Sequence, residues 1–142
     1  MEREIQAMID AHAAFFVTLD FAAISDWYAV PLAVYLGEDL QVCTTREEVM
    51  AGLTARVMIF RGQGVKRLVG SCAATDLPKS GSLRVWVQWD YDFGDRIEPC
   101  GSQVIYYCRR GGPRGLTIQM LQNTRMLMKD VPPDSHVEAS AC

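Results

Sequence analysis

The chain has no excess of positive charge and no long apolar run, and each lack excludes a class of function. Lysine and arginine number 14 against 17 acidic residues, for a net charge of −3. Such a chain has no basic field to hold a phosphate backbone, so we do not expect it to bind nucleic acid. A membrane-spanning helix needs about 20 consecutive apolar residues, and none of the apolar runs is that long. The amphipathic start predicts no signal peptide, so we expect a cytoplasmic protein that binds no membrane.

Signals for metal binding are also missing. There are five cysteines but no two with C-x-x-C spacing, and the only histidines, His12 and His136, lie far from them in sequence. Zinc sites need clustered thiolates and imidazoles, so we expect no metal. No pattern in the chain points to any other cofactor.

What remains is the composition of an ordinary globular domain. The 142 residues are 49% hydrophobic and 22% charged, which suits a single domain that buries most of its surface. We expect one α+β domain over residues 1–129. The polar, proline-containing residues 130–142 predict a flexible C-terminal tail.

The first third of the chain predicts helices. Apolar residues recur at steps of three and four, which forms one stripe of an amphipathic helix. Asp20 is placed to cap a second short helix from Phe21 to about Tyr28, and Pro31 is expected to end helical structure. The stripe of the first helix consists of Ile5, Met8, Ile9, His12, Phe16 and Leu19.

A hairpin and a third helix should follow. Residues 32–36 and 40–43 are apolar segments that flank Gly37, which predicts two strands joined by a short loop. Thr45 and Glu48 have the spacing of a capping box, so a helix should begin there and end towards Gly62 and Gly64.

The remainder predicts β-structure. Strands are expected over residues 65–74, 83–93, 103–110 and 116–126, with turns at 78–81 and 111–115. The second of these strands has the clearest period of two in the chain. Its apolar face should be buried against the helices, so Asp90 and Asp92 on the opposite face should point to solvent or to a partner subunit. The alternative hypothesis is that Asp90 and Asp92 form a catalytic pair of carboxylates. The apolar face consists of Leu83, Val85, Val87, Trp89, Tyr91 and Phe93.

Helices followed by a β-meander indicate an α+β layer in which the sheet curls around the helices. This order resembles the superfamily of ketosteroid isomerase, SnoaL-type polyketide cyclases, scytalone dehydratase and nuclear transport factor two. The resemblance rests on residues 19–28, 45–53 and 86–120. It implies a cystatin-like cone, in which a strongly curved antiparallel sheet wraps around a long N-terminal helix and two shorter helices. It also implies a homodimer formed through the open sheet face, where Trp86 would suit an interface.

The same resemblance implies where a pocket lies. The isomerase's pocket tyrosine falls on His12, its catalytic aspartate near Leu36 beside Tyr35, and its second pocket acid near Tyr106. An isomerase needs a base within reach of the abstracted proton, and Leu36 supplies none. Steroid isomerisation by that mechanism is therefore not expected.

Several side chains are candidates for the site. His12 and Tyr106 are candidate acid and base groups, although a histidine or tyrosine on an apolar face can equally belong to the core. Candidates for ligand binding are Phe16, Trp27, Tyr28 and Tyr35, for which core packing is again the alternative.

Three functions stay open from the sequence. The first is the binding of a small hydrophobic molecule in an apolar cavity. The second is cyclase, dehydratase or isomerase chemistry on a small carbonyl compound, with His12 and Tyr106 as acid and base. The third is a non-catalytic dimeric interaction module whose cavity is filled by side chains.

Overall fold

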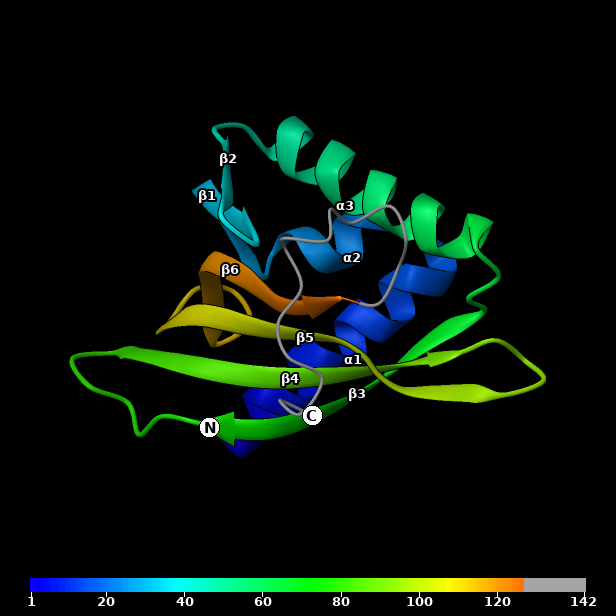
Figure 1. Ribbon diagram of the computed structural model, residues 1–142. Helices are drawn as coiled ribbons and strands as arrows, with labels where there is room; N and C mark the ends of the chain where they lie inside the picture. The colour runs from blue at the N-terminus through cyan, green and yellow to red at the C-terminus, as the bar shows by residue number, and fades with distance from the viewer. Residues whose placement is uncertain (127–142) are drawn as a thin grey trace.

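Figure 1 shows the computed structural model, which describes residues 1–126. Its three helices all come before the last four strands in the chain. The helices are α1 (Glu2–Thr18), α2 (Phe21–Ser25) and α3 (Arg46–Gly62). The strands are β1 (Tyr28–Leu36), β2 (Asp39–Cys43), β3 (Arg67–Thr75), β4 (Ser82–Asp92), β5 (Ile97–Arg110) and β6 (Leu116–Met126). The predicted tail, residues 130–142, lies outside the described residues. No helix within residues 1–126 is long and apolar enough to cross a membrane.

The six strands form one curved sheet in the order β2-β1-β6-β5-β4-β3. Neighbouring strands are antiparallel except β1 and β6, which run parallel. In Figure 1, β3, β4 and β5 form the long part of the sheet, while β1 and β2 lie beside the start of α3. Helix α1 packs against β3 and α2, and α3 lies beside α2 and β2. The predicted α+β cone with a strongly curved sheet is therefore confirmed, with one parallel pairing added, but α3 is as long as α1 at 17 residues and not shorter as predicted.

The local signals act as expected in α1 and α3, whereas Asp20 lies at the N-cap position of α2 but its side chain makes no capping hydrogen bond. In α1 the predicted stripe is buried at Ile5, Met8, Ile9 and Phe16. At the start of α3 the Thr45 hydroxyl accepts a hydrogen bond from the Glu48 amide at 3.1 Å, which confirms the cap. Such a side chain satisfies one of the backbone donors that the first helical turn leaves unpaired.

Three predicted boundaries were wrong. The second helix ends at Ser25, and Tyr28 begins β1 because its backbone pairs with Ile118 of β6. Pro31 lies inside β1, within the irregularity of the β1–β6 pairing, where no regular ladder donor is required. Strand β5 begins at Ile97, six residues before the predicted start.

The apolar side of the sheet faces the helices and forms the core. The predicted alternation of β4 is confirmed, since Leu83, Val85 and Val87 are buried. Asp90 and Asp92 lie on the opposite face, where Asp90 accepts a hydrogen bond from the Cys100 amide at 2.8 Å. Asp92 forms an ion pair with Arg67, so both carboxylates have structural partners outside the core.

Candidate functional site

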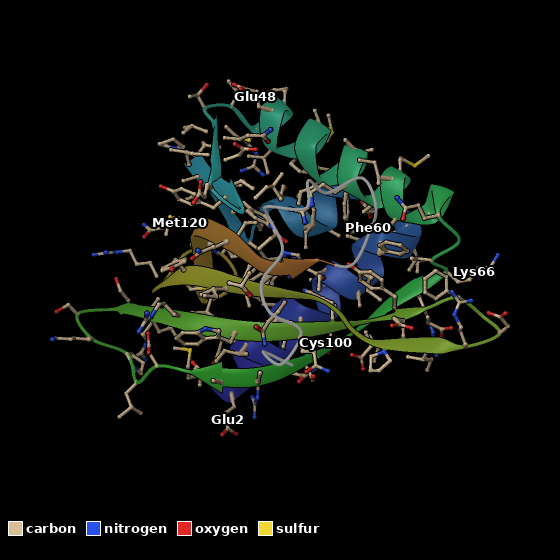
Figure 2. The ribbon with its side chains drawn as sticks, viewed as in Figure 1. Glu2, Glu48, Phe60, Lys66, Cys100 and Met120 are labelled. Carbon is tan, nitrogen blue, oxygen red and sulfur yellow. The ribbon has the colours of Figure 1, made fainter. Side chains whose placement is uncertain are left out.

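Two adjacent cavities lie between α3 and the concave side of the sheet. The smaller has a volume of about 90 Å³ and the larger about 220 Å³. Leu53, Arg56 and Leu121 line both cavities and therefore form the partition between them. Glu48 and Phe60, labelled in Figure 2, mark the two ends of α3. Of the α3 residues, Val49 and Gly52 line the larger cavity while Val57 and Phe60 line the smaller, so the cavities follow one another along the helix.

The smaller cavity contains a hydrogen-bonded histidine–tyrosine pair. Nδ1 of His12 lies 2.7 Å from the Met8 carbonyl oxygen, which can only accept, so Nδ1 carries the proton in the neutral ring. Nε2 is then an acceptor, and it lies 2.6 Å from the Tyr28 hydroxyl, which donates to it. Burial lowers the pKa of His12 to about 4, although the bond to Met8 opposes this. Near neutral pH the imidazole is uncharged, and both ring nitrogens are occupied.

Tyr106 also lies beside this imidazole. The two ring centroids are 5.2 Å apart, and Trp89 lies near the same imidazole at 6.4 Å. Trp89 also lines the smaller cavity beside Tyr106. Tyr106 lines the same cavity, and a neutral tyrosine hydroxyl can donate a hydrogen bond. Burial raises the pKa of Tyr106 to about 12 and that of Tyr28 well above its ordinary value, so both hydroxyls are donors near neutral pH.

Arg56 and Asn123 form a hydrogen-bonded pair at the partition between the cavities. The Arg56 Nη2 atom donates to Asn123 Oδ1 at 2.8 Å, and Asn123 Nδ2 donates to the Tyr35 carbonyl at 3.3 Å. Asn123 is only 3% exposed, so these bonds fix its amide orientation. The network connects α3, β6 and β1 and holds the guanidinium against both cavities.

The predicted site residues separate into two groups. His12, Phe16, Tyr28 and Tyr106 all line the smaller cavity. Trp27 is buried in the core, and neither it nor Tyr35 lines either of the two cavities. The structure therefore brings His12 and Tyr106 together, although the hydrogen-bond partner of His12 is Tyr28.

Sequence reasoning missed Arg56, Ser102 and Asn123, which also line the smaller cavity. For Arg56 the sequence does contain a signal of a functional position. It follows Leu53 by three residues and precedes Phe60 by four, so a charged side chain interrupts the apolar stripe of a predicted helix. Ser102 and Asn123 lie in β5 and β6 and carry no comparable local signal.

Neither cavity is lined by a carboxylate. Among the lining residues there is no aspartate or glutamate, and Leu36, where the resemblance implied the isomerase's base, lines the larger cavity. Within residues 1–126 no group of three or more histidine, cysteine or acidic side chains is placed to hold a metal ion. The polar groups of the site are therefore hydroxyls, amides, the Cys43 thiol, the Trp89 indole N–H, one neutral imidazole and one guanidinium.

Comparison with known proteins identifies the fold. No protein-family profile and no curated protein sequence matches the chain. Among solved structures, a protein of unknown function with a cystatin-like fold from Nostoc punctiforme is 12% identical, with a TM-score of 0.66 over 92% of this chain and 93% of that one. An NTF-2-like protein of unknown function from Shewanella oneidensis is 10% identical, with a TM-score of 0.63 over 86% and 97%.

A third similar structure has a provisional activity in its name. It is a protein from Novosphingobium aromaticivorans, provisionally named an aromatic ring hydroxylase, which is 18% identical with a TM-score of 0.56 over 87% of each chain. At these identities the likeness concerns the backbone and not the chemistry of the cavity. The chain has the NTF2-like, cystatin-like α+β fold.

Proposed function

We propose that this protein binds a small, largely apolar molecule in the two cavities beneath α3. The observation that carries the proposal is the lining, which is mostly aliphatic and aromatic with a few polar groups held in fixed orientations. Binding sites for small molecules have this composition, since apolar walls supply affinity and a few polar groups orient the ligand. A cavity of about 150 Å³ accepts benzene, so the larger cavity has room for an aromatic ring.

Binding without turnover fits the polar groups better than catalysis does. Proton abstraction from carbon needs a base with a free lone pair close to the substrate. The lining offers no carboxylate, and the Nε2 lone pair of His12 accepts a hydrogen bond from Tyr28. The remaining groups are suited to donating hydrogen bonds, which is what a bound carbonyl or carboxylate oxygen requires.

A cavity-filling variant tests the proposal. Gly52 lines the larger cavity, and a Cβ added there meets no atom within 4 Å, so Gly52→Leu should enter space that a ligand would use. Gly62 is also in α3 with open space around it but lines neither cavity, so Gly62→Leu is the matched control. Binding of an apolar panel, followed by NMR chemical-shift changes, should weaken at least tenfold in Gly52→Leu and stay unchanged in Gly62→Leu. Equal binding by the two variants would place the ligand elsewhere.

A second candidate function is supported by the short hydrogen bond between Tyr28 and His12. In this reading Tyr106 protonates a leaving oxygen or polarises a carbonyl, and His12 takes up a proton, which is lyase or cyclase chemistry. Turnover of a small carbonyl compound with a bell-shaped pH profile, lost in His12→Phe, would favour this enzyme over a binding protein. Binding that is insensitive to His12→Phe and accompanied by no turnover would exclude it.

The partner-binding surface that we propose is the outer face of the sheet. Trp86, Ile105 and Gln122 form one row across β4, β5 and β6, and Tyr107 and Met120 lie in the next row. These side chains are half-buried in the single chain, and such apolar and aromatic surface is typical of subunit contacts. We propose that two copies pair through this face. Light scattering should then report a dimer that Trp86→Glu converts to a monomer.

The control for the dimer lies outside the sheet. Leu77 is 90% exposed in the turn between β3 and β4, so Leu77→Glu adds the same charge without touching the proposed interface. A monomeric wild-type protein would refute the proposed dimer. A dimer that persists without any ligand binding would instead favour a pure interaction module.

A further inference from the structure

Ser102 is one of three buried polar residues in residues 1–126, together with Ser25 and Asn123. The Ser25 hydroxyl donates to the Ala22 carbonyl at 3.4 Å. The Asn123 amide donates to the Tyr35 carbonyl at 3.3 Å. The Ser102 hydroxyl has no hydrogen-bond partner in the described part of the chain, although Ser102 and Ser25 are both only 5% exposed. A hydroxyl removed from water without a partner costs free energy, so its burial indicates a partner from outside the chain.

The Ser102 side chain faces the smaller cavity. Ser102, Val104 and Tyr106 lie at alternate positions of β5, are buried, and line that cavity together. Alternate residues of a strand point to the same side of the sheet, so Ser102 points towards the helices as the other two do. Its oxygen is not sealed off by the surrounding protein atoms, so a ligand group in the cavity can reach it.

A β-bulge directly before Ser102 sets this orientation. Residues 100–102 are buried in succession, which breaks the alternation of β5, and the β4–β5 register shifts beside them. Cys100 has a φ of 54°, which is in the left-handed region, and its amide donates to the Asp90 carboxylate at 2.8 Å. Bulges turn individual side chains and are frequent beside active sites. The Asp90 carboxylate therefore holds the bulge that positions Ser102 at the cavity wall.

The surroundings of Ser102 favour an uncharged ligand group. Burial lowers the pKa of His12 and raises that of Tyr28 and Tyr106, so these three groups of the smaller cavity are neutral near neutral pH. Burial outweighs the charge of Arg56, which acts in the opposite direction on both tyrosines. An ionised ligand group in this cavity would meet the same desolvation cost. An uncharged oxygen avoids that cost and still accepts a hydrogen bond from a hydroxyl.

Building on the binding function proposed above, we propose that the ligand carries one uncharged oxygen, a carbonyl or a hydroxyl, which accepts a hydrogen bond from Ser102. The oxygen lies in the smaller cavity, and the rest of the ligand is the apolar body proposed above. Ser102 then fixes the orientation of the ligand, because the hydroxyl of the protein and the oxygen of the ligand each lose water only where they meet.

Probes of matched shape test the role of Ser102. Acetophenone is compared with α-methylstyrene, in which a methylene group replaces the carbonyl oxygen. Similarly, 1-phenylethanol is compared with isopropylbenzene, in which a methyl group replaces the hydroxyl. Binding is followed by NMR titration of the wild-type protein, Ser102→Ala and Ser25→Ala. Ser25 is the matched control, since it is equally buried but has a backbone partner and lines neither cavity.

Ser102→Ala should weaken the binding of at least one oxygen-containing probe about fivefold, the effect of one neutral hydrogen bond, and should not weaken that of its hydrocarbon analogue. A loss confined to acetophenone identifies a carbonyl ligand, and a loss confined to 1-phenylethanol identifies a hydroxyl. Ser25→Ala should leave all four affinities unchanged. If Ser102→Ala alters an oxygen-containing probe and its analogue equally, or alters neither, the role of Ser102 is overturned and the apolar binding function stands. Failure of all four probes to bind the wild-type protein would overturn both.

The melting temperature of the ligand-free protein provides a second readout. Ser102→Ala should melt no lower than the wild-type protein, because the hydroxyl that it removes has no partner in the described chain. A lower melting temperature would show that the hydroxyl already has a structural partner, and would overturn the assignment of Ser102 to the ligand.

Discussion

Acidification should destabilise this protein through His12. Replacing His12 by glutamine, which keeps a donor and an acceptor but does not titrate, should remove that sensitivity. In the folded protein burial keeps the imidazole neutral, with Nδ1 donating to Met8 and Nε2 accepting from Tyr28. A protonated ring would lose the bond from Tyr28 and place a charge in the apolar cavity. The unfolded chain imposes neither penalty.

The magnitude follows from the two pKa values. Burial lowers the pKa of His12 from 6.5 to about 4. Between these values the unfolded chain binds one proton more than the folded protein, so the free energy of unfolding falls as the pH falls. The full difference corresponds to about 3 kcal/mol at 1.36 kcal/mol per unit of pKa. Between pH 7 and pH 4.5 about 2 kcal/mol of it should be lost.

Urea unfolding at pH 7, 6, 5 and 4.5 measures this loss when the wild-type protein and His12→Gln are compared. Several carboxylates outside the core, among them Asp76 and Asp92, also have lowered pKa values and lose stabilising partners in acid. Both proteins contain these groups, so their effect cancels in the difference. The wild-type curve should fall by about 2 kcal/mol more than the variant curve.

Parallel curves for the two proteins would refute the reasoning. They would mean that His12 titrates alike in the folded and unfolded chain, and hence that burial does not keep its ring neutral in the folded protein. A steeper fall in His12→Gln would refute it as well, because removal of the titrating group cannot increase the number of protons taken up on unfolding.

Three further substitutions have expected effects on the free energy of unfolding, each measured by urea denaturation. Tyr28→Phe should cost about 1–3 kcal/mol because it leaves the imidazole acceptor without its donor, whereas Tyr35→Phe, whose hydroxyl lines neither cavity, should cost less. Gly101→Ala should cost more than about 1 kcal/mol, since the added Cβ would lie 2.5 Å from the ring of Tyr91, and a neutral result would contradict this packing. Thr45→Ala should cost about 1 kcal/mol through the lost cap of α3, and Thr45→Ser should cost almost nothing.

Much of the fold could be predicted from local signals. The capping box placed the start of α3 correctly, and the alternation in β4 identified which face is buried. The start of β5 was missed because Pro99 and Gly101 interrupt the pattern there. In the structure Gly101 lets the strand pass close to the Tyr91 ring, beside a shift in the β4–β5 register. A close approach of two backbone segments leaves no periodic trace in a single sequence.

The candidate site was predictable only in part, for a similar reason. His12 stands out because a polar ring lies on an apolar stripe, and the fold resemblance points to Tyr106. The partnership of His12 with Tyr28 depends on where β1 crosses α1, which no spacing in the sequence encodes. Arg56 carried the same kind of signal as His12, a polar side chain within an apolar stripe, and that signal was overlooked.

The parallel pairing of β1 with β6 has a consequence for how the chain folds. Tyr28 and Ile118 come from opposite ends of the described chain, yet they are neighbours in the sheet. The β1–β2 hairpin therefore cannot join the rest of the sheet until β6 has been synthesised. Contacts of such long sequence separation slow folding, because loop-closure entropy is lost before they form. On the ribosome the cavity beneath α3 should be among the last features to form, and until then its apolar walls are open to chaperones.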